Sequence, residues 1–136
     1  MGQFEIQYLD DLRTEITHQS SGEKILTDAP KDNQGEGRFF SPTDMLASSV
    51  GSCMLTILGI YCRTHQLDLK GATCHVEKIM TSNPRRVGKL IVRIKVLGKF
   101  EESVRKKIMI HCKACPVSKS LHPDIKQEIE FDFEAC

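Results

Sequence analysis

Apolar and polar residues alternate in short segments over the N-terminal part of the chain. Phe4, Ile6 and Tyr8 are separated by polar side chains, and residues 12–16 repeat this pattern more weakly. A period of two is typical of half-buried strands, so two antiparallel strands are expected to open the fold. A third strand is expected at residues 24–27, before a long loop at residues 28–37 that is rich in Gly, Asn, Asp and Pro.

A long apolar helix is predicted next. Residues 45–62 carry no charged side chain. Ser41 is suited to cap a helix, Pro42 suits the first helical position, and Asp44 stands where the acid of a capping box belongs. We therefore expect a helix that starts at Pro42 and ends at about Arg63.

This predicted helix is apolar almost all round. At 100° per residue, one face holds Leu46, Val50, Cys53, Ile57, Ile60 and Tyr61. A neighbouring face holds only small side chains, those of Ser48, Ser52, Thr56 and Gly59. Such a helix is either the centre of a globular core or a membrane span, and residues 45–62 reach only the lower limit of a spanning length. The amphipathic strands need something apolar to cover them, so we favour a core helix. The small-residue face would let another helix approach closely, so we also expect the helix to be buried in an oligomer.

The C-terminal part predicts a hairpin, a second helix and a closing strand. Strands at residues 71–81 and 89–97 flank a turn at residues 83–88, and four residues of the second strand share one face: Leu90, Val92, Ile94 and Val96. A helix at residues 101–115 carries an apolar stripe of Val104, Ile108, Cys112 and Cys115. Pro116 begins a further helical turn, which places Cys115 at or near a helix N-terminus. With a last strand over residues 129–133, the order of elements predicts a mixed α+β fold in one domain, residues 1–136.

Composition and charge argue against several classes of protein. A net charge of +1 over 136 residues gives too weak a field to gather nucleic acid or an acidic membrane. The N-terminus carries Glu5 and Asp10 and lacks a basic segment followed by an apolar one, so no export signal is expected and the cytoplasm is the expected location. There the six cysteines should remain thiols unless they are catalytic or bind metal.

Three chemistries are open to these cysteines. A structural zinc site would suit Cys112 and Cys115 with His111 and His122, but no second pair of suitable spacing completes four ligands. A thioredoxin-like CxxC would start a helix, whereas Cys112 lies late in a predicted one. The remaining option is a distant pair, Cys53 and Cys115, in which one thiolate attacks an oxidant and the other resolves the sulfenic acid into a disulfide.

Two motifs surround this distant pair. Residues 41–47 read SPTDMLA and are followed by GSC at residues 51–53, and residues 115–121 read CPVSKSL. Both motifs, in this order, resemble those of the OsmC/Ohr family of osmotically inducible and organic-hydroperoxide-resistance proteins. The resemblance implies an OsmC-like fold, with antiparallel strands flanking a long central helix and a second helix, assembled as an intertwined homodimer.

The same resemblance implies an activity. It indicates a thiol-dependent peroxidase that reduces organic hydroperoxides in oxidative stress defence, with Cys53 as the peroxidatic thiol and Cys115 as the resolving thiol. It implies a dithiol or lipoyl-type reductant. No cofactor is expected, and neither nucleic acid nor a membrane is expected as a partner. The alternative hypothesis is a non-enzymatic dimer of the same fold that senses redox state or binds a small molecule.

Further site residues are also implied by the resemblance. In the family, an arginine from the N-terminal strands and an acid after the proline hold the reactive thiolate, and Arg13 is the best match for the arginine. Thr43 falls where the hydroperoxide-specific members place glutamate, and Asp44 follows it, so Asp44 is either an active-site acid or a helix cap. The positive charge of Arg13 would favour the thiolate form of Cys53, and apolar side chains of the helix would line a pocket for the alkyl part of the substrate.

The other cysteines and two histidines have simpler interpretations. Small buried or terminal roles are expected for Cys62, Cys74 and Cys136, because free cysteine packs like a small apolar residue. Surface or core positions without a catalytic role are expected for His75 and His122. The role of Cys112 is open between plain packing and a part in the resolving step, because it lies one helical turn before Cys115.

Overall fold

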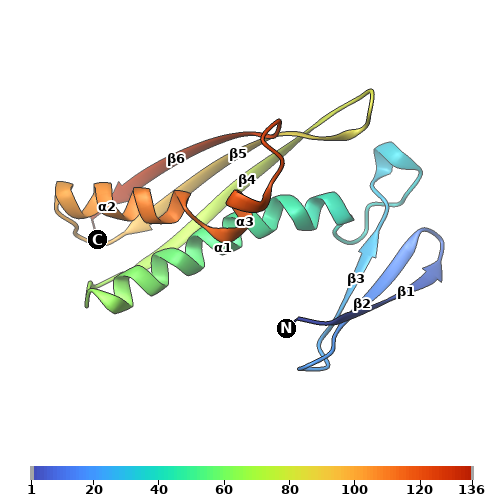
Figure 1. Ribbon diagram of the computed structural model, residues 1–136, viewed down its shortest axis with the longest axis horizontal. Helices are drawn as coiled ribbons and strands as arrows, with labels where there is room; N and C mark the ends of the chain where they lie inside the picture. The colour runs from blue at the N-terminus through green and yellow to red at the C-terminus, as the bar shows by residue number, and fades with distance from the viewer. Residues whose placement is uncertain (1, 136) are drawn as a thin grey trace. The chain divides into compact units, whose positions relative to one another are not determined.

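The computed structural model describes residues 2–135, so the prediction for Cys136 lies outside the described residues. The chain divides into two compact units, one up to Leu46 and one from Ala47 onward. Strands and helices alternate in the order predicted, which confirms the mixed α+β class (Figure 1). The long helix α1 (Pro42–Thr64) begins in the first unit and continues through the second. A single domain over residues 1–136 stays a prediction.

The first unit contains a three-stranded antiparallel sheet. Its strands β1 (Phe4–Asp10), β2 (Arg13–His18) and β3 (Lys24–Asp28) lie in sequence order. Leu12 was expected in the second strand, but it lies in the connecting turn with a φ of 62°. Positive φ values cannot continue a strand, so β2 begins one residue later.

One face of this sheet is apolar and exposed. The strand register places Ile6 opposite Ile16, and Ile16 opposite Ile25. Phe4 and Tyr8 of β1 lie on the same face, since residues two apart in a strand share a face. The side chains of Phe4, Ile6 and Tyr8 are 55%, 58% and 60% exposed. The unit therefore presents an apolar surface that soluble proteins normally cover.

The second unit contains the hairpin and the closing strand in one sheet. Strand β4 (Gly71–Thr81) pairs antiparallel with β5 (Arg86–Leu97), and β6 (Lys126–Glu134) pairs parallel with β5. The predicted inward face of β5 is confirmed by burial of Leu90, Val92, Ile94 and Val96. The strand starts at Arg86 and not at residue 89. Glycine at position 88 has no side chain that would collide with Thr81 of β4, so the pairing with β4 can extend to Arg86. A Cβ at Gly88 would lie 2.1 Å from Thr81 Cγ2.

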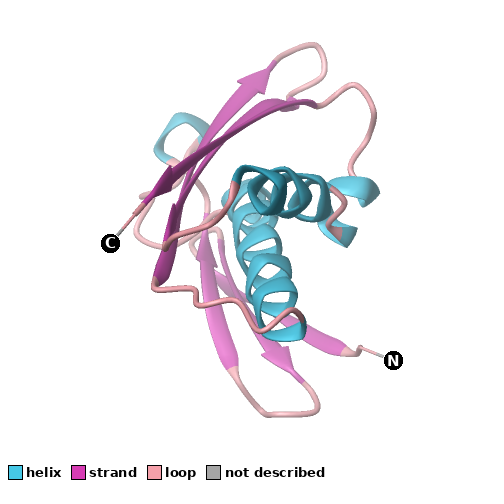
Figure 2. Ribbon diagram, turned by 90° about the vertical axis from the view of Figure 1, so that its left-hand side faces the viewer, coloured by secondary structure: helices cyan, strands magenta, loops and turns pink. Residues whose placement is uncertain are grey.

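Helix α1 lies against one side of this sheet (Figures 1 and 2). It buries a different stripe from the one singled out in the sequence, namely Ala47, Val50, Gly51, Met54, Leu58, Tyr61 and Cys62. Ile60, which was placed on the apolar face, is 55% exposed. The closest approach to the sheet is made by Gly51, where a Cβ would lie 2.9 Å from Cys74 Sγ and 3.0 Å from Val76 Cγ2. At Gly59, no described atom lies within 4 Å of such a Cβ.

By length and composition, α1 could cross a membrane. Met54 and Leu58 in its centre are nevertheless fully buried. An apolar helix that covers a sheet in this way is a core helix. The structure therefore agrees with the core interpretation of the uncharged run.

The second predicted helix is α2 (Glu102–Lys113), which ends two residues earlier than expected, and the further turn predicted from Pro116 is α3 (Pro116–Ser120). Cys115 has extended backbone angles, φ −68° and ψ 146°, and is the N-cap of α3. A residue before proline is disfavoured in the helical region, which explains why α2 ends ahead of Cys115. The predicted place of Cys115 at a helix N-terminus is therefore observed. Ile108 and Cys112 are buried on the expected stripe of α2.

Candidate active site

The second unit brings together the two cysteines of the predicted pair. Cys53 lies in the middle of α1 and Cys115 lies at the start of α3. Both are free thiols, and they lie close enough that Cys53 raises the pKa of Cys115. Cys115 is fully buried, whereas Cys53 is partly exposed. The structure therefore brings a buried thiol close to an accessible one.

The sulfur of Cys115 accepts backbone hydrogen bonds from the turn that follows it. The N–H of Ser118 donates to Cys115 Sγ at 3.3 Å, and the N–H of Val117 also donates to it. Burial raises the pKa of Cys115, the Ser118 N–H lowers it, contact with Cys53 raises it, and the Val117 N–H lowers it. The two N–H groups thus partly offset the cost of forming a thiolate in a buried place.

Cys112 has a different environment, although it lies close in sequence. It is almost completely buried, and burial raises the pKa of its thiol to about 12, with further increases from Cys62 and Cys115. At neutral pH such a thiol stays protonated and is a poor nucleophile. Burial also raises the pKa of Cys62 and that of Cys74. These environments favour Cys115 as the partner of Cys53 and favour a packing role for Cys112.

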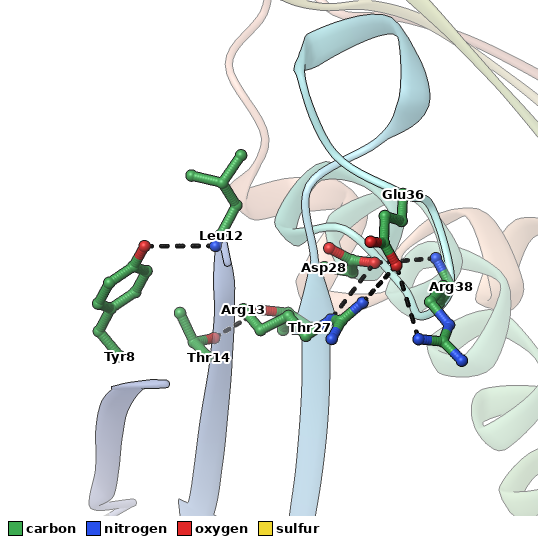
Figure 3. A network of polar contacts seen from close by, with 8 residues as sticks. All are labelled: Tyr8, Leu12, Arg13, Thr14, Thr27, Asp28, Glu36 and Arg38. Carbon is green, nitrogen blue, oxygen red and sulfur yellow. Dashed lines mark hydrogen bonds and ion pairs between the residues drawn. The ribbon is translucent and has the colours of Figure 1, made fainter. Parts of the chain in front are cut away.

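The first unit holds Arg13 in a cluster of charged residues (Figure 3). Arg13 Nη2 lies 2.7 Å from Glu36 Oε2, and Arg13 Nε lies 3.7 Å from Asp28 Oδ2. Arg13 and Asp28 are opposite one another in the register of β2 and β3. The guanidinium also lies over the ring of Phe39, 5.8 Å from its centroid. Arg13 is therefore held by two carboxylates that the sequence had not indicated.

The two carboxylates differ in burial. The side chain of Asp28 is fully buried and accepts a hydrogen bond from the Arg38 N–H at 3.0 Å, while the side chain of Glu36 is 65% exposed. Asp28 Oδ1 and Arg13 Nε are buried without a hydrogen-bond partner among the described residues. Asp28 is thus a fixed neighbour of Arg13, and Glu36 is a surface partner that solvent or an anion can replace. The sequence pattern did not indicate this cluster, because Asp28 and Glu36 both fell in the predicted loop at residues 28–37.

Asp44 has the hydrogen bonds of a helix cap. Its Oδ2 accepts from the Ser41 N–H at 3.0 Å, and its own N–H donates to Ser41 Oγ at 3.1 Å. This reciprocal pair is a capping box with Asp in place of Glu. Helix α1 continues unbroken past Gly51, so no bend brings Asp44, at the start of the helix, toward Cys53. The bonds favour the capping interpretation of Asp44.

Comparison with known proteins agrees with these features. Residues 35–130 match the family model of OsmC-like proteins. The chain belongs to the OsmC family. It is similar to a Psychrobacter arcticus 273-4 protein assigned to osmotic stress induction and the detoxification response, with 44% identity over 96% of each chain and a TM-score of 0.91. No curated protein matches the chain.

Two OsmC family structures with hydroperoxide resistance names share the fold at low identity. The organic hydroperoxide resistance protein OsmC of Legionella pneumophila has a TM-score of 0.74 and 13% identity, over 97% of this chain and 96% of its own. The organic hydroperoxide resistance protein OhrB of Bacillus subtilis has a TM-score of 0.70 and 10% identity, over 97% and 98%. They confirm the OsmC-like fold predicted from the two motifs.

The histidines lie apart from any metal-binding arrangement. His75 is exposed beside Glu77 at 3.7 Å, and His122 accepts a hydrogen bond from the Asp124 N–H at 3.0 Å. Within residues 2–135, no group of three or more His, Cys, Asp or Glu side chains is placed to hold a metal ion. The described cysteines, namely Cys53, Cys62, Cys74, Cys112 and Cys115, are free thiols.

Proposed function

We propose that this OsmC family protein is a thiol-dependent peroxidase that reduces organic hydroperoxides. The observation that supports the proposal most is the proximity of the Cys53 and Cys115 thiols, one partly exposed and the other buried. A peroxidatic thiol needs exposure to substrate and a resolving thiol within reach, and this pair has both. The hydroperoxide resistance names of two relatives of the same fold agree with this chemistry.

The reaction proceeds in three balanced steps. The Cys53 thiolate attacks the terminal peroxide oxygen, an S–O bond forms, the O–O bond breaks, and the organic part leaves as an alkoxide that takes a proton. Cys115 then attacks the Cys53 sulfenic acid as a thiolate, an S–S bond forms, the S–O bond breaks, and the oxygen leaves as hydroxide, which takes a proton to become water. A dithiol of the lipoyl type finally reduces the disulfide and is itself oxidised to a disulfide.

In this proposal, Arg13 is the cation that stabilises the Cys53 thiolate and the developing negative charge on the peroxide. Its carboxylate partner is Glu36, which supplies the acid that Thr43 does not provide. Support comes from the 2.7 Å ion pair between Arg13 and Glu36. Asp28 fixes the base of the Arg13 side chain from its buried position. Asp44 contributes by starting α1 at Pro42.

The proposal includes assembly as a homodimer and location in the cytoplasm. The exposed apolar face of the first sheet, with Phe4, Ile6 and Tyr8, supports a dimer because an apolar surface of this extent marks an interaction site.

The alternative is a redox sensor of the same fold that forms the disulfide without turnover. Its support is that Thr43 stands in the place of the family glutamate and that Asp44 is engaged in the capping box. A sensor would form one disulfide per thiol pair and stop, even with a dithiol present.

Consumption of cumene hydroperoxide with dihydrolipoamide as reductant tests the proposal. The wild type should turn over many times and prefer cumene hydroperoxide to hydrogen peroxide. Cys53→Ser should abolish consumption, because a hydroxyl is a far poorer nucleophile at neutral pH. Cys74→Ser is the matched control and should keep the activity. A wild type that forms the disulfide once without turnover would support the sensor, and full activity of Cys53→Ser would remove Cys53 from the mechanism.

A further inference from the structure

A glutamine stands at an inward position of β6. Gln127 shares a face of the strand with Ile129, Phe131 and Phe133, since residues two apart point to the same side. It is half-buried, and it pairs in the parallel register with Leu90, which is fully buried. A polar side chain on an otherwise apolar face requires hydrogen-bond partners. The hydrogen-bond partners of the Gln127 amide therefore indicate the role of this side chain.

Both ends of the Gln127 amide bind the same residue. Ser118 Oγ donates to Gln127 Oε1 at 2.5 Å, and Gln127 Nε2 donates to the Ser118 carbonyl oxygen at 3.2 Å. Ser118 is thereby fixed through its side chain and its backbone at once. The amide connects the short helix α3 to the beginning of β6, an edge strand of the sheet.

Ser118 is also the residue whose N–H donates to Cys115 Sγ at 3.3 Å. Helix α3 has only five residues. A single turn gains too few internal hydrogen bonds to hold its own conformation, so it depends on contacts from outside. The direction of the Ser118 N–H toward the sulfur therefore depends on what holds Ser118 in place.

We propose that Gln127 is a positioning residue for Cys115: it holds Ser118 so that its backbone N–H stabilises the Cys115 thiolate during the resolving step. This inference rests on the proposed function, because it assigns a role in resolving the Cys53 sulfenic acid. Gln127 touches neither reacting sulfur. It acts through Ser118, whose N–H is at hydrogen-bonding distance from the attacking atom.

The consequence is a competition at Cys53. Its sulfenic acid is either captured by Cys115 or oxidised by a second peroxide to the sulfinic acid. A less stabilised Cys115 thiolate attacks more slowly at neutral pH because less of it is present. Loss of the Gln127 contacts should therefore shift the products from the disulfide toward Cys53 sulfinic acid.

The first experiment measures the ionisation of Cys115 without any peroxide. In a Cys53→Ser background, the thiolate absorbance of Cys115 is titrated with pH and corrected with Cys53→Ser/Cys115→Ser. Gln127→Leu should move the titration of Cys115 upward by about one pH unit, which corresponds to a roughly tenfold loss of thiolate at fixed pH. Gln7→Leu, the same substitution at an exposed strand position, is the control and should not move it.

A second variant tests whether Gln127 acts through Ser118. Ser118→Ala removes one of the two contacts with Gln127 but keeps the backbone N–H, so it should give a smaller shift in the same direction. Combining it with Gln127→Leu should add little beyond Gln127→Leu alone. Additive shifts, or a folded Gln127→Leu protein with an unchanged titration, would overturn the positioning role. If Gln127→Leu does not fold, an unchanged titration in Ser118→Ala has the same meaning.

The second experiment measures the partition of products by mass spectrometry after limiting cumene hydroperoxide. In a chain with both Cys53 and Cys115, Gln127→Leu should raise the ratio of Cys53 sulfinic acid to disulfide by about tenfold, matching the loss of thiolate. An unchanged ratio would contradict the inference. A wild type that never oxidises Cys53 would refute the proposed function, while the titration would still decide whether Gln127 positions Cys115.

Discussion

Replacing Gly51 by alanine tests how closely α1 must approach β4 to place Cys53. A Cβ at Gly51 would lie 2.9 Å from Cys74 Sγ and 3.0 Å from Val76 Cγ2. Both contacts are shorter than van der Waals contact, and Val76 is a β-branched strand residue with little freedom to move. The helix must therefore shift away from the sheet, or the two side chains must change position.

Two opposing terms set the size of the effect. Overpacking a core typically costs about 1–3 kcal/mol, whereas alanine in place of glycine inside a helix gains up to about 1 kcal/mol. Gly51→Ala should therefore lower the free energy of unfolding by about 1 kcal/mol. Gly59→Ala lies on the same helix but meets no described atom within 4 Å, so it should gain the helix term and be stabilised by about 0.5–1 kcal/mol.

The assay is urea unfolding of the two variants and the wild type under identical conditions. The difference between Gly51→Ala and Gly59→Ala should be about 2 kcal/mol. Adding Cys74→Ala to Gly51→Ala removes the closest atom, so the double variant should lose less than the sum of the two single changes. Equal stability of the two glycine variants would refute the packing of α1 on β4 described here.

Three further predictions concern charge and assembly. Burial raises the pKa of Cys112 to about 12, so the folded state keeps a proton that the unfolded thiol releases above about pH 8.5. The free energy of unfolding of the wild type should therefore fall by up to about 1.4 kcal/mol per pH unit above that pH. In urea unfolding, Cys112→Ala should show a smaller decrease with pH over the same range. Equal decreases in the two proteins would contradict this effect of burial. Arg13→Met should lower kcat/KM for cumene hydroperoxide by about a hundredfold, as measured by initial rates, and an unchanged value would exclude Arg13 from the active site. Light scattering should show a homodimer. A well-folded monomer at micromolar concentration would contradict the proposal that Phe4, Ile6 and Tyr8 are covered in a dimer interface.

Much of the fold could be predicted because local patterns and tertiary structure agree in this chain. The alternation of apolar residues in β5 reports burial directly, and Pro116 determines where α2 ends and α3 begins. The predicted stripe on α1 was wrong in detail because a helix that is apolar almost all round does not indicate which side faces the sheet. That choice is made by Gly51, whose missing side chain allows close approach to Cys74 and Val76.

The candidate site was only partly accessible from sequence. The pairing of Cys53 with Cys115 was predicted from two motifs, and the structure places the two thiols close together. The carboxylates around Arg13 were not predicted, because Glu36 comes from an irregular loop whose path no periodic pattern describes. Likewise, Gln127 looks like an ordinary polar residue until its two hydrogen bonds to Ser118 are seen.

Disulfide mapping after limiting hydroperoxide tests the central claim most directly. The wild-type protein is treated with less than one equivalent of cumene hydroperoxide, alkylated, digested and examined by mass spectrometry without reduction. We predict a disulfide between Cys53 and Cys115. In Cys115→Ser, treated with an excess of cumene hydroperoxide because the sulfinic acid consumes two equivalents per thiol, we predict Cys53 oxidised to the sulfinic acid instead. A disulfide found only between Cys112 and Cys115, with Cys53 unmodified, would contradict the account and assign the redox centre to those two residues.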